Sequence, residues 1–528
     1  MLRNLLKYKS ILIMCVCSIA AYTLFGQKHD YNYLSRPSLH FGGIMLKFDD
    51  SIDSLIGSQY NVDHTMSACP SFSDKNGELL FYSNNRNLYN KEGKVIDNGY
   101  DIAVGAFLPY LNSIVSDQTF AIGKNFVTVP LSDSIFYAIH KGVEISAYEF
   151  YDLDVYENGE QLGIYSDGLY LTVIRLAPDG SLYINEDEKK TLIVDEKFEH
   201  NQIVVCKHAN GKDWWIHQPM VETPDAYLLR LNSDGTLINH GRRYFSEHNG
   251  RLRSYSVYKT NPAGNILARI IGTFRQGMHK LELFHFDRCT GSTERFFVDS
   301  LEMAEINTRG IGIEFSQSGR FLYIANSQNI LQLDLDDEEY FENRDTIAVW
   351  DNFVQNGQPT LFEDLWRLPN GKIVVNSGFR LPYLHYIHNP DQKGVACNFE
   401  SRSYISPVDP LSPGSHLDIS FSPNFPEYRM EALDVDCITG TATVASNDII
   451  DAIIYPNPVL DILNIDFRGT IEKVDIQVVS ASGIVMNRYY SVSSRLSFST
   501  HDYPSGIYIV IVTSVDDDKQ FSDRFIKM

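Results

Sequence analysis

Short hydrophobic runs separated by turn-forming residues recur along most of the chain. Residues 321–325 (Phe-Leu-Tyr-Ile-Ala) form a continuous apolar run, and residues 330–335 alternate between apolar and polar positions. A short continuous run is typical of a strand buried on both faces, whereas alternation is typical of a strand with one exposed face. Long helical periodicity is missing, and residues 187–198 are the best candidate for a helix. The pattern therefore predicts an all-β chain.

Glycine turns repeat at a nearly constant interval. Gly211, Gly264, Gly319 and Gly371 each precede a hydrophobic run, and the intervals between them are 53, 55 and 52 residues. A repeat of that length, built from short strands around Gly turns, is typical of a β-propeller blade. We therefore expect a β-propeller domain over residues 40–436, with about seven blades and with six or eight left open.

The chain changes character after the last repeat. Residues 437–452 are mostly small and polar, as expected of a linker. Residues 453–528 contain six or seven short runs that are typical of strands, and residues 474–478 and 508–512 are the expected central strands. A short segment with this many strands predicts a small Ig-like β-sandwich.

The net charge of the chain argues against two classes of binding partner. The sequence holds 67 acidic and 45 basic residues, which gives a net charge of −22 over 528 residues. Nucleic acids and anionic membrane surfaces require clustered Lys and Arg, so we expect neither as a partner. The acidic run at residues 334–342 offers carboxylates that Ca²⁺ prefers, but it lacks the ligand spacing of an EF-hand loop, so we predict no metal site.

The N-terminus has the features of a secretory signal peptide over residues 1–26. Basic Arg3, Lys7 and Lys9 precede an apolar run that is too short to span a bilayer. We place the cleavage near Gly26, with Ala20 as the alternative. No later stretch is long and apolar enough for a membrane helix, so we expect export without a transmembrane anchor.

Five cysteines follow the signal peptide, and their number is odd. They are widely spaced, with neither a Cys-x-x-Cys pair nor a Cys/His zinc pattern. Export permits one or two disulfides, whose connectivity stays open, and at least one cysteine is expected to be free or to pair with another chain. We expect at least two to be buried as small apolar side chains. The five are Cys69, Cys206, Cys289, Cys397 and Cys437.

Histidines and tryptophans are the remaining candidates for chemistry. Trp214 and Trp215 offer rings for stacking on sugars, although alternation favours one facing the core and the next facing out of the blade. A histidine and aspartate cluster near one end of a propeller would suit metal-assisted hydrolysis, but the spacing follows the blade period rather than a ligand geometry. Its candidates are His208, His217, His285, His385, His388, Asp213 and Asp287.

Known catalytic signatures are missing from the sequence. It contains no Gly-x-Ser-x-Gly elbow, no His-Glu-x-x-His pair and no phosphate-binding loop. Propellers present their loops for binding, so we predict a binding or scaffold module with no catalytic, cofactor-binding or metal-binding residues. The alternative is a secreted hydrolase or lyase acting on extracellular polymers.

A series of short motifs runs through the predicted propeller in a fixed order. They are residues 41–43, 77–83, 98–99, 129–131, 136–137, 208–215, 286–291, 312–316, 331–334, 388–390, 394–398 and 423–426. Together they resemble a propeller-type family common in secreted proteins of Bacteroidetes. Residues 261–264 and 316–319 depart from the Ser-Pro-Asp-Gly turn of that family but keep its glycine. The resemblance implies no catalytic residues.

The C-terminal segment carries the most specific motifs. They are Tyr455-Pro-Asn-Pro458, Ala481-Ser-Gly-Ile-Val485, Tyr503-Pro-Ser-Gly-Ile-Tyr508 and Phe525-Ile-Lys527. This segment closely resembles the type A C-terminal sorting domain of the type IX secretion system. The resemblance implies a sorting motif made of Tyr455, Pro456, Asn457, Pro458, Gly483, Gly506, Tyr508 and Lys527.

The same resemblance implies a route and partners. The signal peptide would take the chain to the periplasm, and the C-terminal domain would address it to the outer-membrane translocon. A sortase would then remove that domain and attach the cargo to surface lipopolysaccharide. We therefore expect a secreted or surface-displayed protein, whose extracellular ligand, a glycan or a protein, the sequence does not identify.

Overall fold

The computed structural model is built from strands, with two short 3₁₀ helices, η1 (Glu186–Glu188) and η2 (Gly394–Cys397), among the described residues. The chain divides into two compact units, Met1–Cys437 and Ile438–Met528. The predicted signal peptide, Cys69, Gly483 and residues 438–451 of the predicted linker lie outside the described residues. The structure describes residues 27–35, 43–60, 70–84, 86–102, 124–142, 144–146, 156–157, 160–161, 163–199, 202–221, 223–247, 254–273, 278–302, 311–355, 357–377, 381–408, 415–417, 419, 423–433, 437, 452–467, 473–480, 485–492, 495–514 and 520–528.

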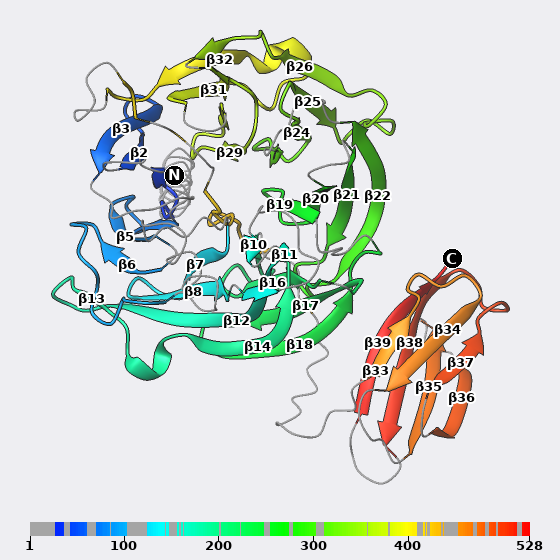
Figure 1. Ribbon diagram of the computed structural model, residues 1–528. Helices are drawn as coiled ribbons and strands as arrows, with labels where there is room; N and C mark the ends of the chain where they lie inside the picture. Colours follow the sequence, from blue (N-terminus) through cyan, green and yellow to red (C-terminus); the bar gives the residue numbers. More distant parts are fainter. Residues whose placement is uncertain are drawn as a thin grey trace, which may run out of the picture. The chain divides into compact units, whose positions relative to one another are not determined.

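The described part of the large unit consists of small antiparallel sheets arranged around a ring (Figure 1). Strands β7, β19 and β29 lie toward the centre, and β18, β22 and β32 lie at the rim (Figure 1). The first three sheets along the chain are β1 (Asn32–Ser35), β2 (Gly43–Asp49) and β3 (Ser54–Tyr60); β4 (Ser71–Ser73), β5 (Leu79–Ser83) and β6 (Leu88–Asn90); and β7 (Phe126–Pro130), β8 (Ile135–Lys141), β9 (Glu144–Ser146), β12 (Gly163–Leu176), β13 (Leu182–Tyr183) and β14 (Thr191–Phe198). The next two sheets are β15 (Val204–Lys207), β16 (Trp214–Pro219), β17 (Asp225–Leu231) and β18 (Leu237–Tyr244); and β19 (Ser254–Thr260), β20 (Ile266–Thr273), β21 (Met278–Phe286) and β22 (Thr293–Glu302). The last two sheets are β23 (Gly312–Phe315), β24 (Phe321–Ala325), β25 (Asn329–Asp334) and β26 (Asp345–Val349); and β29 (Leu365–Arg367), β30 (Ile373–Asn376), β31 (Tyr383–Ile387) and β32 (Phe399–Ile405). Two short hairpins accompany them, β10 (Tyr156–Glu157) with β11 (Glu160–Gln161) and β27 (Val354–Gln355) with β28 (Gln358–Pro359).

The four repeated glycines occupy equivalent turns. Each lies between the first and second strands of its sheet and has a positive φ: 71° at Gly211, 73° at Gly264, 79° at Gly319 and 86° at Gly371. A side chain is strained in this left-handed region, which explains why the repeat keeps glycine there. The turn prediction is confirmed, and so is the buried strand at residues 321–325, which is β24.

Hydrophobic side chains pack between neighbouring sheets. Ile270 and Leu283 of one sheet, for example, share a core with Ile313 and Leu322 of the next. The same kind of packing joins the ends of the ring, because the Tyr33 ring lies 5.6 Å from the Trp366 ring. The first and last sheets are therefore neighbours.

The helix expected at residues 187–198 is wrong. Only the single turn η1 forms, and β14 (Thr191–Phe198) pairs with β12 along that stretch. Val194 and Phe198 are buried while Asp195 and Lys197 are exposed, so the segment follows the period of a strand. Pairing with β12 outweighs the helical propensity of its Glu and Lys residues.

The C-terminal unit consists of two antiparallel sheets around one core. One sheet has the order β33 (Ala452–Tyr455), β34 (Ile462–Phe467) and β37 (Leu496–Ser499). The other has the order β36 (Val485–Val492), β35 (Val474–Ser480), β38 (Gly506–Ser514) and β39 (Gln520–Lys527). Buried residues of both sheets share a single cluster. The expected central strands are confirmed as β35 and β38.

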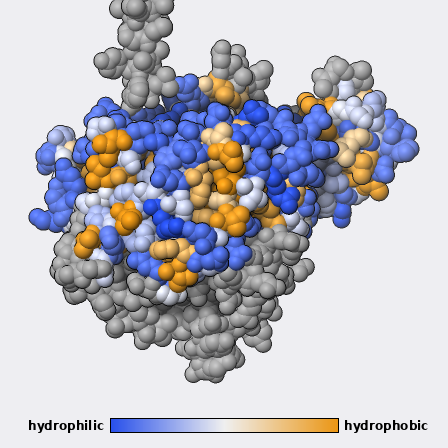
Figure 2. All heavy atoms as spheres, turned by 90° about the horizontal axis from the view of Figure 1, so that it is seen from above, coloured by the Kyte–Doolittle hydropathy of each residue, from blue (hydrophilic) through white to orange (hydrophobic). Residues whose placement is uncertain are grey.

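The surface is largely hydrophilic on the side that Figure 2 displays. Hydrophobic residues among the coloured, described ones gather there in small groups (Figure 2). Small groups of this kind are ordinary for a folded protein, so no interface follows from this view alone.

Candidate functional site

The Tyr455–Pro458 motif lies beside the last strand of the chain. Asn457 donates from Nδ2 to the Arg524 carbonyl over 3.0 Å, and the Ile526 amide donates to Asn457 Oδ1 over 2.8 Å. One side-chain amide thus satisfies two backbone groups of β39, as a neighbouring strand would. We call the contact between this motif and β39 the tail clamp.

Backbone hydrogen bonds extend the tail clamp to the chain end. The Val459 amide donates to the Ile526 carbonyl over 2.8 Å, and the Met528 amide donates to the Val459 carbonyl over 3.1 Å. Val459 and Lys527 form a parallel bridge. Because β39 is an edge strand, the clamp covers backbone groups that would otherwise be open to pairing with another chain.

The other motif residues stand close to the same strand. Gly506 pairs with Lys527, and Tyr508 pairs with Phe525, whose ring it stacks against at 5.4 Å. The Tyr508 hydroxyl donates to the Pro504 carbonyl over 2.7 Å. The sequence-predicted residues Asn457, Gly506, Tyr508 and Lys527 therefore come together around β39.

Tyr455 fixes the opposite end of the motif. Its hydroxyl hydrogen-bonds to the Asp466 carboxylate, which raises the pKa of Tyr455. Asn464 donates to the Tyr455 carbonyl over 3.2 Å. The motif side chains therefore hold the fold of the tail, and Tyr508, Lys527 and Val459 are buried.

Residues 423–433, which we call the plug, run through the centre of the ring as the gold segment of Figure 1. The Tyr428 hydroxyl donates to the Thr128 carbonyl over 2.8 Å, and Asn424 donates to the Lys124 carbonyl over 3.1 Å. Arg429 forms two hydrogen bonds with Asp30, and Glu427 pairs with Arg367. The plug thus contacts sheets on several sides of the ring.

The plug continues over the turns of two neighbouring sheets. The Leu433 amide donates to the Ala209 carbonyl over 2.8 Å, and Arg288 donates to the Glu431 carbonyl over 2.6 Å. A Cβ added to Gly211 would lie 2.8 Å from the Ala432 nitrogen. The glycine of this turn therefore also leaves room for the plug.

A small cavity beside the plug has a volume of about 60 Å³, which is room for a few water molecules. Its charged lining is balanced, because Lys259 pairs with Glu314 at 2.8 Å and Arg367 pairs with Glu427. Nearby, Lys207 donates to the Tyr428 carbonyl, and burial lowers the pKa of Lys207 to about 8. These charged groups around the plug thus help to hold it in place.

The structure does not bring the candidate histidines together. His208 lies by Trp215, His217 by Phe245, His285 by Phe296, His385 by Ser377 and His388 by Glu400. Asp213 and Asp287 accept hydrogen bonds from turn amides. Burial lowers the pKa of His217 and of His385 to about 3, so both imidazoles are neutral. Within the described residues no group of His, Cys, Asp or Glu is placed to hold a metal ion.

Trp214 and Trp215 face opposite sides of their sheet, as alternation predicts. Trp214 belongs to one core cluster and Trp215 to another. Both are 1% exposed, and the Trp215 indole donates to the Arg288 carbonyl over 2.8 Å. Stacking of these two rings on a sugar is therefore excluded.

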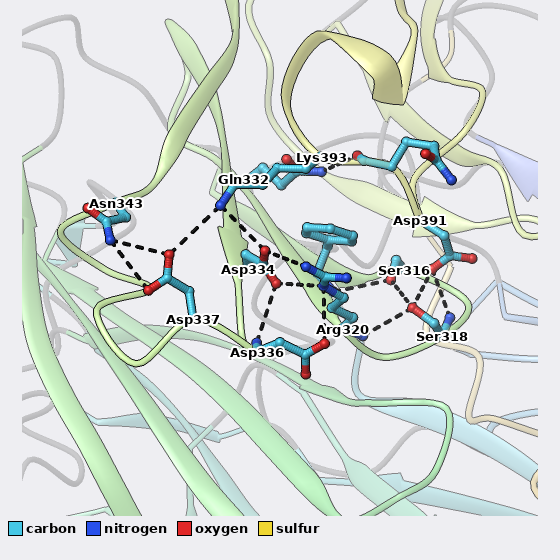
Figure 3. Close-up of polar contacts among 12 residues, drawn as sticks. Ser316, Ser318, Arg320, Gln332, Asp334, Asp336, Asp337, Asn343, Asp391 and Lys393 are labelled. Carbon is cyan, nitrogen blue, oxygen red and sulfur yellow. Dashed lines mark hydrogen bonds and ion pairs between the residues drawn. The ribbon is translucent and has the colours of Figure 1, made fainter.

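The acidic run at residues 334–342 pairs with cations of the protein (Figure 3). Arg320 donates two hydrogen bonds to Asp334, of 2.7 and 2.8 Å, and lowers the pKa of that carboxyl. Arg320 also pairs with Asp336 at 3.2 Å, and Lys393 approaches Asp337 to 3.8 Å. These contacts, drawn around Arg320 in Figure 3, favour an ion-pair network over a Ca²⁺ site.

One disulfide joins Cys289 to Cys437 across 148 residues of sequence. Cys206 and Cys397 are free and buried, which confirms the expectation for at least two small apolar cysteines. The disulfide fixes the last residue of the large unit to the turn between β21 and β22. Sequence left this pairing open, because nothing in the spacing selects it.

Comparison with known proteins identifies the tail. Residues 453–528 match the family described as "Secretion system C-terminal sorting domain". The tail is thus a sorting domain of a secretion system, and the protein is a cargo protein of the type IX secretion system, exported to the cell surface or beyond. No curated protein matches the chain.

Solved structures give a weaker comparison. PorZ, an essential bacterial surface component of the type IX secretion system of Porphyromonas gingivalis, is 11% identical with a TM-score of 0.27, over 92% of this chain and 73% of that chain. An oligogalacturonate lyase in complex with manganese is 11% identical with a TM-score of 0.31, over 63% of this chain and 78% of that chain. With TM-scores this low, neither structure supports a conclusion about the function of the large unit.

A search of the described helices reveals none with the length and hydropathy needed to cross a membrane.

Proposed function

We propose that the large unit is a seven-bladed β-propeller that acts as a binding or scaffold module outside the cell. The plug carries this proposal, because it runs through the centre of the ring, where the cavity beside it measures about 60 Å³. A ligand of sugar or peptide size is then expected on the loops at the outer faces of the ring. The ligand class stays open between glycans and proteins.

The tail would serve as the sorting signal that the translocon recognises and the sortase removes. The tail clamp supports this role, because a signal read as a folded domain must keep its shape until it is recognised. The proposed boundaries are a signal peptide over residues 1–26, the propeller over 40–436, the linker over 437–452 and an Ig-like sorting domain over 453–528.

Deleting residues 451–528 tests the sorting role. We expect the truncated protein to fold but to accumulate in the periplasm, because the large unit has its own cores and its own disulfide. Fractionation and mass spectrometry of the mature ends give the readout. Full-length cargo is expected to start near Gln27 and to end before residue 453 at the surface. Normal surface display of the truncated protein would contradict the proposal.

The catalytic alternative is a hydrolase or lyase acting on extracellular polymers. His208 and Asp213 share Asn210 as a hydrogen-bond partner in one turn, and the other candidate histidines have separate neighbours, so no observation favours this alternative. The full chain can be tested on a glycan array and on soluble polysaccharides in parallel. Binding without new reducing ends supports the module, and turnover of a polysaccharide would overturn it.

A further inference from the structure

Exposed aliphatic side chains stand on the outward face of the larger tail sheet. In β38, Tyr508, Val510 and Val512 are buried in the core, so the alternate residues face outward. Ile507 is 47% exposed and Ile509 is 38% exposed. Two large aliphatic residues thus meet solvent on one strand.

Strand register extends this surface onto the neighbouring strands. Ile509 pairs with Val479 of β35, which pairs with Val485 of β36, and Ile507 pairs with Ile526 of β39. Directly paired residues share a face. The aliphatic patch is therefore Val479, Val485, Ile507, Ile509 and Ile526.

The same face becomes polar further along the strands. Apart from Ile511 and the exposed Tyr490, the residues there are polar, because Ile511 pairs with Gln477 and Ser522, and Thr513 pairs with Asp475. The aliphatic patch is thus confined to the end of the sheet where the tail clamp holds β39. A contiguous exposed apolar group with a polar border is a candidate interaction surface.

Several motif residues are engaged inside the tail, although Pro456 and Asn457 are exposed at its surface. Tyr508, Lys527 and Val459 are buried, and the Asn457 amide is used by the backbone of β39. Because the hydrogen bonds of the motif are used to hold β39, we take the exposed surface beside the motif as the surface that a partner reads. Among the described residues of the tail, the aliphatic patch reaches the tail clamp through Ile526, and Leu460 and Met528 are also exposed beside the clamp.

We propose that the aliphatic patch is the docking surface for a protein of the type IX secretion machinery. This inference rests on the proposed sorting role. Arg488, one row away from Val485, stands at the border of the patch. The matching surface of the partner is therefore apolar at its centre and acidic at its rim.

The size of the patch selects among possible occupants. Its exposed area is on the order of 300 Å², whereas a stable interface needs roughly 800 Å² from each partner. A second copy bound through this face alone would not form a lasting dimer. A transient contact of this size suits a cargo that the secretion machinery first binds and then releases.

Charge reversal of the patch gives the main test. In the full chain, Ile507→Asp with Ile509→Asp should lower the surface fraction at least tenfold and raise the periplasmic fraction. The matched control is Thr513→Asp, an exposed outward position of the same strand beyond the patch, which should be displayed like the wild type. Display of the double variant at the wild-type level would overturn the proposal.

A milder variant separates docking from folding. Ile507→Thr with Ile509→Thr keeps β-branched residues, and amide exchange of Val510 and Phe525 in the purified full chain reports whether the tail stays folded. Reduced display of this folded variant supports the proposal, and normal display contradicts it. A concentration-dependent dimer of the wild type that the variant loses would make a second copy the occupant and overturn it. If deletion of residues 451–528 also leaves display intact, the sorting role itself has failed.

Discussion

Arg429 and Asp30 lie 399 residues apart in sequence and form a bidentate ion pair, with hydrogen bonds of 2.7 and 2.6 Å, at the centre of the ring. Asp30 precedes the first sheet, and Arg429 belongs to the plug. The pair therefore ties the start of the large unit to its end.

Replacing Arg429 with Met should destabilise the large unit by about 3 kcal/mol, because it leaves a mostly buried Asp30 carboxylate unpaired. Urea unfolding gives the measurement. The exposed pair of Lys75 and Asp133 is the control, and Lys75→Met should leave the unfolding free energy nearly unchanged. Adding Asp30→Asn to the Met variant should restore part of the loss, and a further loss would contradict the electrostatic explanation.

The glycine turns allow backbone strain to be separated from contact with the plug. Gly180 has a φ of 86° and nothing within 4 Å of an added Cβ, so Gly180→Ala should cost about 1 kcal/mol. Gly211→Ala has the same strain and also pushes on the Ala432 backbone, so we expect a loss of about 3 kcal/mol. Denaturant midpoints compare the two variants. Equal losses of unfolding free energy would show that the backbone at Ala432 shifts at little cost.

The disulfide should stabilise the large unit by about 4 kcal/mol, since it closes a long loop of the unfolded chain. We expect Cys437→Ser to lower Tm by several degrees. Reductant should lower the Tm of the wild type toward that of the variant while leaving the variant unchanged. A wild-type Tm that does not respond to full reduction would refute the stabilising role.

Buried histidines should make stability depend on pH. Burial lowers the pKa of His140, His217 and His385 to about 3 in the folded state, against 6.5 for an ordinary histidine. Below pH 6.5 the unfolded chain binds protons that the folded chain does not, so stability is complete above pH 6.5 and falls toward pH 3. At pH 5 each histidine should cost about 2 kcal/mol.

Unfolding free energies measured between pH 6 and pH 4 check this expectation. His385→Gln should reduce the slope by about 1.4 kcal/mol per pH unit, since one titrating group is removed. His501, whose side chain is 78% exposed, is the control, and His501→Gln should leave the slope unchanged. An unaltered slope in the His385 variant would assign the pH dependence to other groups.

The tail clamp predicts a local effect at the end of the chain. Asn457→Ala removes both side-chain hydrogen bonds to β39 and should destabilise the tail by about 2 kcal/mol. Amide exchange at Ile526 should accelerate, because its acceptor is lost. Asn487→Ala, which removes a single bond to the Tyr489 hydroxyl, is the matched change within the tail and should leave Ile526 protected.

Local features were predictable because they depend on local physics. The continuous apolar run of β24 and the positive φ of Gly319 follow from residues a few positions apart. The central strands of the tail follow from alternation in the same way. At residues 187–198 local propensity pointed to a helix, and pairing with a distant strand decided against it.

The plug could not be predicted, because its contacts are almost all remote. Residues 423–433 show neither a helical nor a strand period, and their partners include Thr128 and Arg288 far along the chain. A faint signal was the presence of Phe425, Tyr428 and Met430 in a proline-containing stretch, since apolar residues without a period still need a core. The inward role of the tail motif was hidden for the same reason, because a motif does not reveal which of its side chains are buried.

The Cys289–Cys437 bond has a mechanical consequence. Cys437 is the last residue of the large unit, so a mechanical force on the tail reaches that unit first at Cys437. The disulfide transmits this force to the turn between β21 and β22. The hydrogen bonds of the plug therefore do not have to carry the whole force. A force applied to the C-terminal end would thus reach the large unit at a covalent cross-link, and the hydrogen bonds of the plug would bear less of it.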